Sequence, residues 1–266
     1  MNSNNVAKLI ENGTSIVVHS GNITNWIPLH KKQTLSTSDT IVSAVEAAIK
    51  NWMGREYNAE EWKGPGSVLI RNASLLKSVS AEELRDHQFT VKVFLAESNG
   101  DALRSAVETT MNELGIRSIH LLVVSLAQSA EELTLEQLKP VWKAMEELVH
   151  NKTVVSLGTG GLTQPRLQEL YEWAQVKPKV NQVNLPDCCD MPMELVKYSK
   201  EKEIQLQTNN DEADVVPTNV LCDVLSSTFG SDCSAWKQTW ISRYTSVIHL
   251  RSIVTHKGYL LGLHRT

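Results

Sequence analysis

Two titratable side chains lie inside apolar stretches, where catalysis could use them. Lys92 lies in FTVKVFLA and His120 lies in IHLLVV. A desolvated lysine can take part in catalysis, and an imidazole can act as a general base. Each residue also has a structural alternative: Lys92 can reach past its strand end to a carboxylate, and His120 can be a hydrogen-bonded core histidine. We favour the structural alternatives, because structural ion pairs also perturb lysine and no Ser/His/Asp or Cys/His set lies nearby in sequence.

The adjacent Cys188 and Cys189 offer thiol chemistry in a Pro-Asp loop. Consecutive Cα atoms are about 3.8 Å apart, which is shorter than the usual separation across a disulfide, so a bond between these two would be strained. A thiol of a partner protein is an easier match, which makes the pair a candidate for an interface or a redox role. The alternative, to which we give more weight, is that both side chains are buried against the sheet, as most free cysteines are.

Recognised catalytic and metal-binding motifs are absent from the sequence. It contains no GxSxG elbow, HExxH pair, Walker loop or CxxC pair, and each absence removes a named mechanism. The four cysteines lack the spacing of a zinc site and are too few for a disulfide scaffold. We predict no catalytic residue, no cofactor and no metal site.

The composition of the chain argues against two classes of partner, nucleic acids and membranes. The formal net charge is -4, and without an excess of clustered Lys and Arg we expect no nucleic-acid partner. The N-terminus has no apolar signal region, and the longest apolar run, Leu121 to Ala127, is far shorter than the roughly 20 residues that cross a bilayer. We expect no membrane association, and a cytoplasmic protein.

The stretch from Thr153 to Leu185 has the pattern of a βαβ unit. A β-branched apolar run from Thr153 to Leu157 is followed by two glycines, an amphipathic segment from Thr163 and a second strand-like run from Val180. A strand, a crossover helix and a returning strand of about 30 residues form one parallel unit.

The same alternation extends along the chain, and it weakens towards both ends. Further strands are predicted at 15–18, 89–96, 119–124 and 204–207, and further helices from Ser38 or Asp39 to Trp52 and at 99–114, 134–149 and 192–198. We expect irregular structure at 54–80, an acidic loop at 209–216 and a mixed pattern from there to Trp236. Extended or mixed segments are expected at 241–250 and 254–263.

Repeated strand-helix alternation over 266 residues predicts an α/β fold. A TIM-type (β/α)8 barrel takes about 250 residues. No glycine-rich dinucleotide fingerprint follows an early strand, which disfavours a doubly wound sheet. We therefore predict a single barrel domain spanning residues 1–266, with degenerate or irregular segments.

Several stretches together resemble one known family. They are SGNITNW, KVFLAESNG, LTLEQLKPVW, LQELYEWAQVKPKVNQVNLPDCCDMP, EIQL and HKGYLL. The resemblance is to the regulatory, or modifier, subunits of glutamate-cysteine ligase, and it runs from about Ser20 to Leu261. That family is related to the aldo-keto reductases, which implies an aldo-keto-reductase-like barrel.

Aldo-keto reductases carry out hydride transfer with an Asp, Tyr, Lys and His set, and the resemblance allows these positions to be compared with this chain. Lys92 matches the family lysine, and Gln182 matches the glutamine that helps to hold the nicotinamide. The position of the catalytic histidine holds Ser125, and no tyrosine matches in the early helix region. Gly160 and Gly161 replace the Ser-Asn pair that binds the carboxamide.

The position of the stacking tyrosine holds Asn209. Lys92 and Gln182 are therefore candidates for a vestigial cofactor site. Loss of a general acid lowers the reaction rate roughly 100- to 10,000-fold.

The resemblance implies a regulatory subunit without catalysis of its own. Such a subunit binds the catalytic subunit of glutamate-cysteine ligase as a heterodimer, lowers its KM for glutamate and relieves glutathione feedback inhibition in glutathione biosynthesis. Two alternatives remain open. One is an NADPH-dependent aldo-keto reductase, and the other is a structural scaffold that associates without a kinetic effect.

Overall fold

The structure is a computed structural model that describes residues 13–26, 35–54, 66–76, 86–128, 132–184, 191–212, 214–229, 233–248 and 253–265. The chain divides into two compact units, one made of residues 1–87 and 216–266 and the other of residues 88–215. The single-domain organisation stays a prediction. No helix among the described residues is long and apolar enough to span a bilayer.

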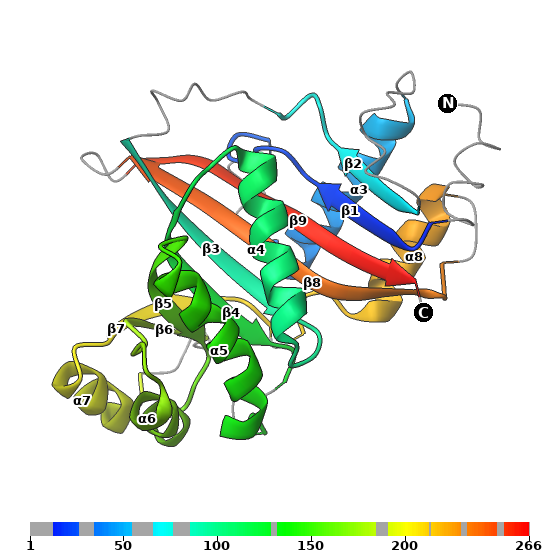
Figure 1. Ribbon diagram of the computed structural model, residues 1–266. Coiled ribbons are helices and arrows are strands. Elements are labelled where there is room, and N and C mark those ends of the chain that lie inside the picture. The colour runs from blue at the N-terminus through cyan, green and yellow to red at the C-terminus, as the bar shows by residue number, and fades with distance from the viewer. Residues whose placement is uncertain are drawn as a thin grey trace. The chain divides into compact units, whose positions relative to one another are not determined.

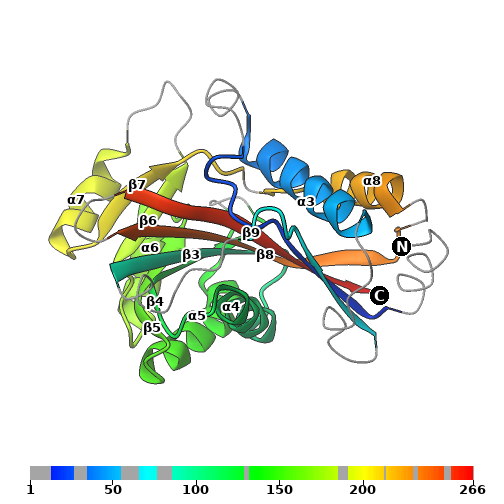
Figure 2. The ribbon, with the colours of Figure 1, turned by 90° about the horizontal axis from the view of Figure 1, so that it is seen from above.

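The first unit is a mixed sheet with helices on it. Its strands, in the spatial order β2-β1-β9-β8, are β1 (Ser15–His19), β2 (Ser67–Arg71), β8 (Trp236–Ile248) and β9 (Ile253–Arg265). The β1/β2 pair is parallel, whereas β9 is antiparallel to both β1 and β8. The helices α3 (Thr37–Met53) and α8 (Thr218–Phe229) lie side by side (Figure 2).

The second unit consists of parallel strands in chain order, β3-β4-β5-β6-β7, with a helix after each of the first four (Figure 1). The strands are β3 (His87–Leu95), β4 (Ile119–Leu126), β5 (Val154–Gly160), β6 (Val180–Asn184) and β7 (Gln205–Asn209). The helices are α4 (Gly100–Leu114), α5 (Leu135–His150), α6 (Gln164–Trp173) and α7 (Met193–Glu201).

Local signals fix the helix ends of the second unit. The Asn99 side chain accepts hydrogen bonds from two backbone N–H groups at the start of α4, and Gly115 ends that helix in the left-handed region. Thr134 and Gln137 form the predicted capping box of α5. The middle of β4, Leu122 to Val124, is buried, as expected of a parallel strand covered on both faces.

The predicted α/β class and the parallel βαβ unit are confirmed. Consecutive β/α units in chain order are the arrangement of a TIM-type barrel. Among the described strands, hydrogen bonds within either unit do not close its sheet into a ring.

Three details of the prediction were wrong. The irregular segment 54–80 contains strand β2, whose apolar SVLIR run pairs with β1. The mixed segment between Val216 and Trp236 contains helix α8, which buries Leu221, Leu225 and Phe229. Helix α3 is capped by Ser36 and not by Ser38 or Asp39, because Asp39 takes the third helical position and completes a capping box with Ser36.

Candidate functional site

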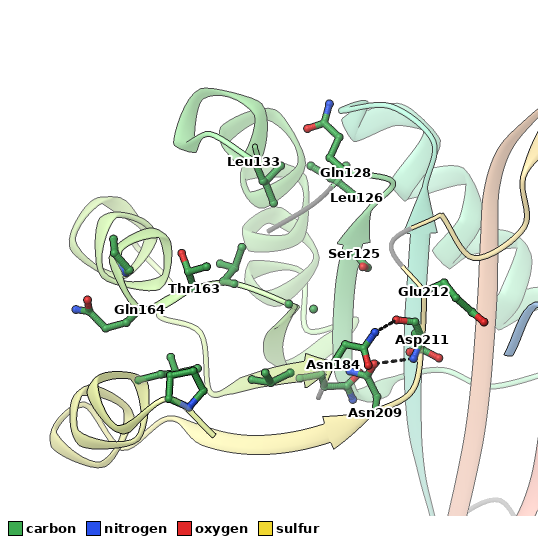
Figure 3. Close-up of a pocket in the computed structure, with 18 of the residues that line it drawn as sticks. Ser125, Leu126, Gln128, Leu133, Thr163, Gln164, Asn184, Asn209, Asp211 and Glu212 are labelled. Carbon is green, nitrogen blue, oxygen red and sulfur yellow. Dashed lines mark hydrogen bonds between the residues drawn. The ribbon is translucent and has the colours of Figure 1, made fainter. Parts of the chain in front are cut away.

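A cavity of about 570 Å³ lies at the carboxyl ends of the parallel strands of the second unit (Figure 3). Each strand contributes to its wall: Lys92 from β3, Ser125 and Leu126 from β4, Gly160 and Gly161 at the end of β5, Gln182 to Asn184 from β6, and Asn209 from β7. This is the end of a parallel α/β sheet at which ligands and active sites are usually found.

A buried ion pair lies in this cavity. The Lys92 ammonium is 2.7 Å from the Asp211 carboxylate, and the two side chains are only 3% and 4% exposed. Burial of an unpaired charge is costly, so the carboxylate stabilises the lysine in its apolar strand. The structural alternative for Lys92 includes such an ion pair, and here the carboxylate lies in the loop after β7.

The loop after β7 is held so that Asp211 faces the lysine. The Asn184 side chain donates to the Asp211 carbonyl oxygen at 2.7 Å, and the Asp211 N–H donates to the Asn209 side chain at 2.9 Å (Figure 3). Two amides at adjacent strand ends therefore fix the backbone that carries the carboxylate.

The glycines after β5 leave room in the cavity. A Cβ atom at Gly160 would lie 3.1 Å from the Ser125 side chain and 3.4 Å from the Lys92 Cε atom. Gly161 has φ +75°, a conformation that favours glycine, and its N–H donates to the Gln182 carbonyl oxygen at 2.5 Å. Residues with side chains at these two positions would narrow the cavity and strain the turn.

Asn181 fixes the wall behind the cavity. Its fully buried side chain accepts from the Thr159 hydroxyl at 2.9 Å and from the Leu162 N–H at 3.2 Å, and it donates to the Leu162 carbonyl oxygen at 2.9 Å. One side chain thereby satisfies both backbone groups of Leu162 in the loop that leads from β5 into α6.

The structure brings together the positions that the resemblance had matched. Lys92, Ser125, Gln182 and Asn209 line one cavity with the two glycines. His120 lies half-buried on β4 and does not line this cavity among the described residues. Cys188 and Cys189 lie outside the described residues.

Asp211 is the residue that the sequence analysis missed. It lies in the segment 209–216, which is predicted only as an acidic loop, although a lysine inside a buried strand needs a countercharge. An acidic residue shortly after a neighbouring strand end is the sequence signal that could have identified it, because carboxyl ends of parallel strands meet at one edge of a sheet.

The chemistry available in the cavity is limited. Its described lining contains no tyrosine, histidine or cysteine, and its lysine is paired with Asp211. Within the described part of the chain, no group of three His, Cys, Asp or Glu residues is placed to hold a metal ion. The remaining polar lining consists mainly of amides and hydroxyls, which bind and orient a ligand.

Comparison with known proteins supports the resemblance. No protein-family model matches the chain. It is 29% identical over 261 residues to the human glutamate-cysteine ligase regulatory subunit, covering 97% of this chain and 95% of that protein. It is 25% identical over 195 residues to an uncharacterized oxidoreductase of Bacillus subtilis, covering 71% and 65%.

A solved aldo-keto reductase from a deep-sea metagenome library aligns with a TM-score of 0.41 and 23% identity, over 50% of this chain and 45% of that one. The predicted resemblance is confirmed: over nearly its whole length, this chain is similar to proteins named glutamate-cysteine ligase regulatory subunit.

Proposed function

We propose that this chain is a regulatory subunit of glutamate-cysteine ligase. It binds the catalytic subunit in a heterodimer, lowers the KM of that subunit for glutamate and raises the glutathione concentration needed for feedback inhibition, in the cytoplasm. The observation that carries the proposal is the similarity to named regulatory subunits over 97% of the chain and 95% of the human relative.

The cavity supports a non-catalytic role. Reduction of a carbonyl needs a proton donor within hydrogen-bond reach of the substrate oxygen. The described lining offers no tyrosine or histidine to fill that role. Lys92 and Gln182 fit the proposal as vestiges of a cofactor site.

The second candidate function is an NADPH-dependent reductase. It is favoured by the relative named as an oxidoreductase and by the presence of Lys92 and Gln182 in one cavity. NADPH oxidation measured with a panel of small aldehydes distinguishes the two. The proposal predicts the rate of the protein-free control, whereas turnover that disappears in Lys92→Met would establish the reductase.

Association with the catalytic subunit tests the proposal itself. We expect the two purified proteins to form a one-to-one complex in size-exclusion chromatography or analytical ultracentrifugation. Absence of a complex with a catalytic subunit from the same source would overturn the proposal. A complex without any change in catalytic constants would leave only a scaffold function.

A further inference from the structure

Two cysteines of the first unit lie close to the same serine. Cys222 is half-buried on α8, and Cys233 is buried shortly before β8. The Cys222 Sγ atom is 4.0 Å from the Oγ atom of Ser226, about one turn further along the helix. The same Oγ atom accepts a hydrogen bond from the Cys233 N–H at 3.2 Å. A single hydroxyl group therefore separates the Cys222 thiol from the backbone of Cys233.

The backbone on both sides of this contact is held in place. The Cys233 carbonyl oxygen accepts a hydrogen bond from the Trp236 N–H at 3.0 Å, at the start of β8. Leu225 and Phe229 anchor α8, because both are buried. Rotation about the Cα–Cβ bond moves either thiol without moving this backbone, so the two sulfur atoms can approach each other while the elements that carry them stay folded.

The two thiols differ in their access to solvent. Cys222 is half-buried and can react with a small molecule in solution, whereas Cys233 is only 1% exposed. Redox-sensitive sites often combine an accessible cysteine with a neighbouring resolving cysteine. A resolving thiol attacks inside the protein, so the burial of Cys233 does not prevent its reaction with Cys222.

We propose that Cys222 and Cys233 form a reversible disulfide by exchange with a small disulfide such as oxidised glutathione. The Cys222 thiolate attacks one sulfur of the small disulfide, and the displaced thiolate takes up the proton that Cys222 has lost. The Cys233 thiolate then attacks the Cys222 sulfur of this mixed disulfide, and the second small thiol leaves with the Cys233 proton. The protein loses two electrons and two protons, which the small disulfide gains.

The bond would join the middle of α8 to the chain that enters β8. A disulfide stabilises a protein mainly by restricting its unfolded chain, so the oxidised protein should unfold at a higher urea concentration than the reduced one. The proposal goes beyond the regulatory role, since the bond and its effect on stability can be measured on this chain alone.

Peptide mapping tests the proposal directly. The variant Cys188→Ser/Cys189→Ser retains Cys222 and Cys233 as its only cysteines. After incubation of this folded variant with oxidised glutathione, we expect mass spectrometry to identify a peptide pair linked through Cys222 and Cys233. Both residues should then resist alkylation by iodoacetamide in denaturant, and dithiothreitol should restore both reactions.

Single variants on the same background separate the two steps. Cys233→Ser should stop at the mixed disulfide of glutathione with Cys222, whereas Cys222→Ser, whose remaining thiol is buried, should stay unmodified. The proposal would be overturned if the protein with both cysteines also stops at the mixed disulfide, keeps Cys222 reduced, or forms only disulfide-linked dimers. None of these outcomes bears on association with the catalytic subunit.

Discussion

The Lys92 ammonium on β3 lies 2.7 Å from the carboxylate of Asp211, which is 119 residues further along the chain. The pair joins the first strand of the second unit to the loop after its last strand. It therefore helps to fix the relative positions of the strands that border the cavity.

Removing one member of this pair should be more harmful than removing both. Asp211→Asn leaves a buried ammonium and Lys92→Met leaves a buried carboxylate, so each single variant should lower the free energy of unfolding by about 3 to 5 kcal/mol. In the double variant Lys92→Met/Asp211→Asn no charge remains buried, and we expect much of this loss to be recovered. Urea denaturation of all four proteins gives the coupling energy.

The exposed pair of Arg104 and Glu147, at 2.6 Å with side chains 42% and 57% exposed, is the matched control. Glu147→Gln should cost no more than about 1 kcal/mol, because an exposed ion pair contributes little. If the losses from the two single variants of the buried pair simply add in the double variant, the proposed coupling is wrong.

Asn181 should be essential to the stability of the cavity wall. Asn181→Ala leaves the N–H and C=O groups of Leu162 without their side-chain partner, so we expect a loss of about 2 to 4 kcal/mol in the free energy of unfolding. Asn112→Ala is the control, since that exposed side chain makes no such contact. A loss at Asn181 as small as that at Asn112 would show that the loop is held by other contacts.

Tyr244 should make the stability of the first unit depend on pH. Its hydroxyl donates to the Gly21 carbonyl oxygen at 2.9 Å, and burial raises its pKa. In the unfolded chain, tyrosine ionises at about pH 10. The stabilising contribution of the neutral phenol is therefore complete below that pH, and it is lost as pH rises towards the higher pKa of the folded state. Tyr244→Phe has no phenol to ionise.

The stability difference between wild type and Tyr244→Phe should therefore be constant up to about pH 10 and should decrease above it. Guanidinium denaturation of the two proteins over this range measures the difference, and effects of other titrating groups cancel. A difference that does not change above about pH 10 would contradict the account of the buried phenol.

The secondary structure of the second unit could be predicted because its signals are local. The Thr134 and Gln137 capping box and the glycine turn after β5 act within a few residues of chain. Helix α8 had a readable signal in the four-residue spacing of Leu221, Leu225 and Phe229, although the intervening serines, threonine and cysteine obscure it.

The candidate site was only partly predictable for a different reason. The resemblance identified the positions of Lys92 and Gln182, because both lie in recognisable strands. The Lys92–Asp211 pair could not be read from local pattern, because it joins residues far apart in sequence, and the orientation of Asp211 depends on the side chains of Asn184 and Asn209.

The Cys188–Cys189 pair gives a prediction about the complex that rests on sequence alone. After mild oxidation with the catalytic subunit, we expect a heterodimer crosslinked through one of these thiols, visible on non-reducing gels. Replacement of both cysteines by serine should abolish the crosslink, whereas Cys222→Ser, which changes a half-buried cysteine of α8, should leave it intact. Equal crosslinking of the wild type and the double serine variant would exclude the pair.

Kinetic titration of the catalytic subunit with this chain tests the regulatory role most directly. We expect the KM for glutamate to fall and the inhibitory concentration of glutathione to rise as the chain is added, each saturating at one equivalent. Coupling free energies of about 1 to 3 kcal/mol correspond to changes of roughly 5 to 150-fold, and linkage requires that bound glutamate tighten subunit association by the factor by which its own affinity rises. Saturating association with the KM for glutamate and the glutathione inhibition both unchanged would contradict the proposed function.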